Sequence, residues 1–128
     1  MKSKTEAIII SSMNVGEADK LVTFFSLDRG MQKGVAKNAR KSFKRFGAGL
    51  EAFTTCRLHL HEREHQDLVR IESADILAQP AEICTDLERA AAGAVMLELV
   101  KELAPPGERN ASAFLLLSHV LHLLNAGD

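Results

Sequence analysis

The sequence predicts a mainly β fold with added α structure, namely a five-stranded barrel followed by two helices. Two observations support this prediction. Five short segments rich in β-branched, aromatic or alternating apolar residues lie within residues 1–79. After Pro80 that pattern stops, and alanine- and leucine-rich sequence takes over. We therefore expect two units, a barrel over 1–79 and the first helices of a truncated helical domain over 80–128.

Three strands are expected in the first 37 residues. Segment 5–12 is a β-branched run typical of a buried strand, and segment 20–26 is rich in branched and aromatic residues. Asp28-Arg29-Gly30 has the composition of a tight turn, because glycine accepts a positive φ. Segment 31–37 is then the returning strand of a hairpin.

Two more strands complete the barrel. Segment 51–61 alternates apolar residues with arginine and histidine, which is typical of a half-buried strand. Residues 62–67 have the composition of a polar turn, and segment 68–77 is the fifth strand. Five strands in so short a chain favour a partly closed Greek-key barrel of the OB type. An SH3-like barrel has a similar number of strands and is the main structural alternative.

The second part of the chain is helical. Segment 88–98 contains strong helix formers, and Asn110 is a suitable N-cap for a second helix over 111–124, with Gly127 beyond its end. The second helix is apolar around most of its circumference, which is typical of helices buried on all sides. We expect either that the chain is cut short or that these helices pack against a partner or a twin. The alternative is that they cover the barrel and leave apolar surface exposed.

Charge divides the chain into two halves. Residues 1–50 contain ten Lys or Arg and four Asp or Glu, whereas residues 51–128 contain six and thirteen. An excess of positive charge in one half predicts an anionic partner for it. No apolar run is long enough to cross a bilayer, and the two cysteines fit a reducing cytoplasm better than a disulfide framework.

Every charged residue between Arg29 and Leu50 is positive, and two phenylalanines lie among them. Cations bind phosphate oxygens, and flat aromatic faces stack on unpaired bases. We therefore predict a nucleic-acid-binding surface; a solvated loop pinned by its phenylalanines, or a site for anionic lipid or an acidic protein tail, would explain the same charge. The predicted DNA contacts are Lys33, Lys37, Arg40, Lys41, Lys44 and Arg45, with Phe43 and Phe46 as base-stacking residues.

The sequence offers little support for catalysis. His59 and His61 share one strand face at a spacing that some metal sites use, with His65 nearby, but a third ligand and supporting residues cannot be identified. Cys56 is expected to be a buried thiol, and Cys84 lies near a helix start, where the pKa of a thiol can fall. We predict no catalytic residue, no metal and no cofactor, and therefore no enzyme.

Several motifs together resemble the bacterial recombination-repair RecO family. They are the opening Thr5-Glu6-Ala7-Ile8-Ile9-Ile10, the block Gly16-Glu17-Ala18-Asp19-Lys20-Leu21, the stretch from Gly30 through Val35-Ala36-Lys37-Asn38-Ala39-Arg40-Lys41, the segment Leu50-Glu51-Ala52-Phe53, and Asp86-Leu87-Glu88-Arg89. Asn38 occupies a position where the family usually has glycine, although asparagine also tolerates a positive φ. The family usually continues into more helices and a cysteine-rich zinc element.

The resemblance implies an OB fold that binds single- and double-stranded DNA without sequence specificity and promotes strand annealing. It also implies work with RecR in loading RecA onto strands coated by single-strand-binding protein, whose acidic tail would dock on the helical part. By motif position, Lys37, Arg40 and Lys41 are the implied DNA contacts. A cytoplasmic, nucleoid-associated location and no membrane partner are expected. The alternatives are an adaptor whose basic loop and apolar helices bind an acidic partner, and a metal enzyme built on His59 and His61.

Overall fold

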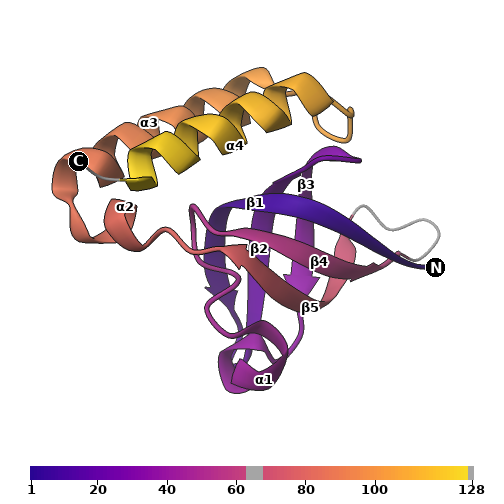
Figure 1. The fold of residues 1–128 in the computed structure, drawn as a ribbon. Helices are drawn as coiled ribbons and strands as arrows, with labels where there is room; N and C mark the ends of the chain where they lie inside the picture. The colour runs from indigo at the N-terminus through magenta and orange to yellow at the C-terminus, as the bar shows by residue number, and fades with distance from the viewer. Residues whose placement is uncertain (63–67, 127–128) are drawn as a thin grey trace.

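The computed structural model describes residues 1–62 and 68–126, which form a five-stranded barrel and a group of helices (Figure 1). The elements of the barrel are β1 (Lys2–Val15), β2 (Asp19–Ser26), β3 (Gly30–Ala36), a 3₁₀ turn (Ala39–Lys41), α1 (Phe43–Phe46), β4 (Thr55–His61) and β5 (Val69–Ala78). The helices that follow are α2 (Ala81–Thr85), α3 (Leu87–Leu103) and α4 (Ala111–Ala126).

The strands close into a barrel in the order β1-β2-β3-β5-β4. Neighbouring strands are antiparallel except β3 and β5, which pair in parallel through Gly34 with Val69 and Val35 with Arg70. β1 is long enough to pair with β2 along one edge and with β4 along the other, and it shifts register between Ile9 and Ser11. Such a bulge bends a strand, and this bend lets β1 pair with both β2 and β4. The expectation of an OB-type barrel followed by helices is confirmed.

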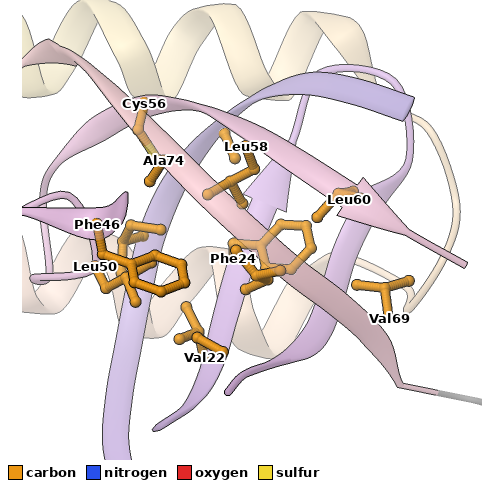
Figure 2. Packing of buried hydrophobic residues seen from close by; sticks show 13 residues of the cluster. Val22, Phe24, Phe46, Leu50, Cys56, Leu58, Leu60, Val69 and Ala74 are labelled. Atoms are coloured by element: carbon orange, nitrogen blue, oxygen red, sulfur yellow. The ribbon is translucent and has the colours of Figure 1, made fainter. Parts of the chain in front are cut away.

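Alternation along the strands separates the interior of the barrel from its outer wall. The buried interior side chains include Phe24, Leu58, Leu60 and Ile71, and Figure 2 shows part of this cluster. Cys56 belongs to it and is fully buried, as its strand pattern predicts. A full set of interior side chains of this kind fills a small barrel, so the barrel has a core of its own.

A second apolar cluster joins the outer wall of the barrel to α3 and α4, which lie side by side over it (Figure 1). Ile8, Ile10 and Phe25 come from the strands, while Leu97 and Phe114 come from the helices. The rings of Phe25 and Phe114 lie 6.0 Å apart. The helices therefore bury one side against β1 and β2, and α1 lies at the opposite end of the barrel (Figure 1).

The helix caps predicted from the sequence are confirmed in part. The side-chain oxygen of Asn110 accepts a hydrogen bond from the backbone nitrogen of Ala113 at 3.1 Å, so the predicted N-cap of α4 is confirmed. Asp86 caps α3 in the same way. Gly127, expected beyond α4, lies outside the described residues. The short helix α2 was not predicted, and Asn125 fixes its start by accepting hydrogen bonds from the backbone of Glu82 and Ile83.

Some predicted boundaries were wrong. β1 extends beyond 5–12 at both ends, and β4 begins at Thr55 rather than at 51. Residues 51–53 form a turn, in which Phe53 adopts a φ of 71°. The turn expected at 62–67 lies, from 63 onward, outside the described residues. Segment 38–49, for which no strand was predicted, contains the 3₁₀ turn and the single turn of α1.

At Gly30 the backbone of the barrel lies directly against the connection between α3 and α4. Gly30 has a φ of 71°, and a Cβ atom at this position would lie 2.0 Å from the carbonyl oxygen of Glu108. The backbone nitrogen of Gly107 donates a hydrogen bond of 2.8 Å to the carbonyl of Met31, and Met31 forms a parallel bridge with Pro106. The start of β3 and the helical connection are therefore held together by their main chains.

Candidate nucleic-acid interface

The six predicted cations, here called the basic track, follow β3 and the segment after it. They are Lys33, Lys37, Arg40, Lys41, Lys44 and Arg45. Lys33 lies on the outer wall of β3, and Lys37 follows the strand directly. Lys37 lies four residues beyond Lys33, a separation of about 13 Å along an extended chain. The other four lie in the 3₁₀ turn and α1, at the end of the barrel away from α3 and α4 (Figure 1).

The four lysines of the basic track are all exposed. The ammonium group of Lys37 lies 3.6 Å from a carboxylate oxygen of Asp19. Within the described residues, no ion pair joins Lys33, Lys41 or Lys44 to a carboxylate. These three charges are therefore open to solvent and to an anionic ligand.

The two arginines of the basic track bind the protein itself. Arg40 donates from one guanidinium nitrogen to the carbonyl oxygens of Gly16 and Glu17, at 3.2 and 3.1 Å. Its backbone nitrogen donates to the carbonyl of Ala18 at 3.0 Å. Arg40 thus fastens the 3₁₀ turn to the connection between β1 and β2. Asn38, which precedes that turn, adopts a φ of 58°, in agreement with its expected tolerance of this conformation.

Arg45 has more contacts than any other member of the basic track. Its Nε donates to the hydroxyl of Ser42 at 3.0 Å, and its two terminal nitrogens donate to the carbonyls of Glu72 and Lys37. The guanidinium carbon also lies 4.7 Å from the centre of the Phe46 ring. Because the planar guanidinium group offers several donors in a fixed arrangement, one side chain holds β5, the end of β3 and α1 together.

The two predicted stacking residues differ sharply. Phe43 is 81% exposed, so its face is available to an unpaired base. Phe46 is 2% exposed and belongs to the interior cluster of the barrel, next to Leu50 in Figure 2. The prediction that Phe46 stacks on a base is therefore wrong: α1 turns this ring into the barrel, where burial of its apolar surface stabilises the fold.

The two histidines on β4 are paired with carboxylates of β5. His59 Nε2 lies 2.7 Å from an oxygen of Asp75, and His61 Nδ1 lies 3.5 Å from an oxygen of Glu72. The hydrogen bond with His59, helped by the charges of Arg57 and Lys4, holds the pKa of Asp75 below its usual range. Within the described residues, no group of three or more potential metal ligands is present. His65 lies outside them.

A hollow that no sequence pattern indicated adjoins the basic track. Its volume is about 760 Å³, and it lies between β3 and the end of α3. Lys33 is on its wall, together with Gln32, Lys101 and Leu103. Gln32 and Lys33 lie far from Lys101 and Leu103 in the sequence, and the docking of the helical connection onto Gly30 brings the two pairs together.

No helix of the described residues combines the length and the apolar character needed to span a membrane. The fold and the surface described above define an OB-fold protein that carries a helical extension. Residues 1–80 match the family model described as recombination protein O N terminal, and residues 84–128 match the model for its C terminal part. The chain therefore belongs to the RecO family.

Relatives of known name agree with that assignment. The chain is 41% identical over 127 residues to the DNA repair protein RecO of Koribacter versatilis, a match that covers 99% of this chain and 52% of the relative. It is 38% identical over 124 residues to the DNA repair protein RecO of Syntrophotalea carbinolica, covering 92% and 47% of the two chains. The protein of the same name in Geobacter metallireducens is 36% identical, covering 98% and 51%. The chain spans about half the length of these relatives.

Proposed function

We propose that this chain binds the phosphate backbones of single- and double-stranded DNA, without sequence specificity, through the basic track. The observation that carries the proposal is the set of exposed lysines, Lys33, Lys37, Lys41 and Lys44, along β3 and α1. Cations that contact phosphates release condensed counterions, which supplies affinity that does not depend on sequence. The name that the relatives share, DNA repair protein RecO, supports this choice of polyanion.

Within this proposal the lysines and arginines have different roles. The lysines contact phosphates, because all four are exposed: they are Lys33, Lys37, Lys41 and Lys44. Arg40 and Arg45 are positioning residues first, since each donates to two backbone carbonyls; Arg40 is exposed and retains further donors for a phosphate. Phe43 is the stacking residue for unpaired bases.

The wider activities belong to the same proposal. A cationic surface reduces the repulsion between two DNA backbones, so it promotes annealing without any chemical step. Work with RecR, loading of RecA and docking of the tail of single-strand-binding protein concern the whole family protein. We extend them to this chain as proposals, together with a nucleoid-associated location and the division into a barrel over 1–79 and a helical unit over 80–128. No catalytic residue is part of this function.

The dependence of DNA affinity on salt tests the basic track. Replacing Lys41 and Lys44 together by alanine should flatten the log–log slope for a single strand by about 1.4, because each phosphate contact contributes roughly 0.7. The measurement is a fluorescence anisotropy titration of the full chain at several salt concentrations.

A double replacement of Lys2 and Lys4 by alanine is the matched control for this test. It removes the same charge from β1, a strand that is not adjacent to β3 in the barrel. The control should leave the slope within about 0.3 of the unmodified chain, as expected for cations that make no phosphate contact. Equal slopes for the two double variants would show that the basic track does not contact phosphate.

A protein-binding adaptor is the second candidate function. The exposed large apolar side chains of α3 and α4 favour it: they are Val95, Leu99, Leu103, Leu115, Leu116 and Leu123. Apolar surface of this extent often marks an interface. The test is to measure binding to single-stranded DNA, to duplex DNA and to an acidic peptide at 50 mM salt. Binding of the peptide without measurable affinity for either DNA would favour the adaptor over the DNA-binding proposal.

A further inference from the structure

We infer that the hollow between β3 and the end of α3 binds unpaired bases of a DNA strand that runs along the basic track. This inference deepens the proposed function and rests on it. The hollow, of about 760 Å³, is within the size range of sites that hold small organic ligands. Its position beside Lys33 makes it the continuation of the basic track towards the helices.

The wall of the hollow combines the groups that an unpaired nucleotide requires. Lys33 and Lys101 are cations on the wall. Apolar side chains form much of the rest, and they include Met31, Leu68, Leu103, Pro105 and Pro106. Leu68 is 42% exposed and Leu103 is 77% exposed, so both present apolar surface that a flat base could cover. The lysines would hold the phosphates on either side of that base.

The hollow fits a base better than a carboxylate-rich peptide. The carboxylate of Glu102 is part of its wall, and α3 ends there at Leu103. The C-terminal end of a helix carries partial negative charge, which disfavours a carboxylate inside the hollow but not a neutral base, while Lys33 and Lys101 attract the flanking phosphates. A duplex cannot use the hollow, because its bases are stacked and paired. The hollow therefore selects single strands, whereas the lysines of the basic track bind both forms.

The test uses the full chain, a fluorescent 20-nucleotide oligodeoxythymidylate and a 20-base-pair duplex. Leu103→Asp places a carboxylate in the hollow at an exposed position, so folding should not suffer. Affinity for the single strand should fall about tenfold, while affinity for the duplex changes less than twofold. Leu116→Asp is the matched control: Leu116 is 63% exposed on α4 and does not line the hollow, so both affinities should stay within twofold.

Lys101→Ala provides an independent readout. It should flatten the salt slope for the single strand by about 0.7 and leave the slope for the duplex unchanged. Equal losses for single strand and duplex in Leu103→Asp, or no loss for either, would overturn the inference while the proposed function stands. An acidic peptide that binds the unmodified chain but not Leu103→Asp, with strand affinity unchanged, would also overturn it. An unmodified chain that binds neither DNA would overturn both.

Discussion

The barrel and the helical pair bury their apolar residues to different extents. The barrel closes on itself and encloses fully buried side chains such as Phe24 and Leu58. The helices α3 and α4 bury one side against β1 and β2, while Leu116 and other leucines remain largely exposed. A closed sheet satisfies its own strand edges, but a two-helix layer has one covered side only. The barrel therefore encloses a core of its own, whereas the helices bury their apolar side chains on one side only, against the barrel wall.

The largest expected effect is on the free energy of unfolding. Phe46→Ala removes a ring from the interior of the barrel and should destabilise the chain by about 3–5 kcal/mol. Leu116→Ala, on the exposed side of α4, should change the stability by less than about 0.5 kcal/mol. Urea denaturation of the two variants measures the difference. Similar losses would mean that the helical surface is as closely packed as the barrel interior.

The next largest loss of stability is expected from a substitution at the junction between the barrel and the helices. Gly30→Ala combines a positive φ with a Cβ atom against the backbone of Glu108. In Gly16→Ala, the φ of 64° is similar, but nothing lies within 4 Å of the added atom. We expect Gly16→Ala to cost about 1 kcal/mol from conformation alone. Gly30→Ala should cost about 1–3 kcal/mol more because of the steric overlap.

Hydrogen exchange gives a local measure of the same junction. The backbone amide of Gly107 donates to Met31, so Gly30→Ala should accelerate its exchange, whereas Gly16→Ala should not. An unchanged exchange rate at Gly107 in both variants would show that the two regions are not held together here.

A smaller effect on stability is expected at Arg45, on α1 at the end of the barrel. Arg45→Lys keeps the charge but loses the planar group that donates to Ser42, Glu72 and Lys37. We expect a loss of about 1 kcal/mol, typical of net hydrogen-bond contributions at a half-buried site. Limited trypsin cleavage after Lys41 and Lys44 should become faster. Lys44→Arg, which also exchanges one cation for another, should leave stability unchanged.

The smallest expected effect is a difference in reactivity between the two cysteine thiols, one in each region. Burial raises the pKa of the Cys56 thiol to about 12, so this thiol stays protonated at pH 8. Cys84 on α2 is exposed. A thiol reagent at pH 8 should therefore modify Cys84 in the native protein and reach Cys56 only after denaturant is added. Two rapidly modified thiols in the native protein would contradict the closed barrel.

The same pKa shift also predicts a dependence of stability on pH. The pKa of Cys56 is higher in the folded chain than the ordinary value of 9.0. The protonated thiol therefore favours the folded state at pH below about 9, and this contribution is lost as the pH rises towards 12. The midpoint of urea denaturation should accordingly fall between pH 9 and 11, and Cys56→Ala should reduce that fall.

The sequence predicts this fold well where the pattern is local. Alternation in segment 51–61 identifies the inward-facing Cys56 and Leu58, and the composition at Asn110 identifies the cap of α4. The roles of Phe43 and Phe46 could not be separated, because both are aromatic and both lie in the basic segment. Only the turn of α1, which places one ring in the interior cluster and leaves the other in solvent, distinguishes them.

The candidate site was predicted less completely. The cations of the basic track were identifiable from their charge, and Lys33 and Lys37 from the period of the strand. The contacts of Arg40 and Arg45 were not predictable, because their partners Gly16 and Glu72 are distant in the sequence. The hollow beside Lys33 likewise depends on how residues after α3 dock onto Gly30, which no local pattern encodes.

The main-chain link between Met31 and Gly107 has a mechanical consequence. β3 starts where the barrel is hydrogen-bonded to the connection between α3 and α4. It ends just before the 3₁₀ turn that contains Lys41. A force applied along β3 would therefore be shared by the barrel and the helices through this hydrogen bond, so the helices would brace the strand that carries Lys33.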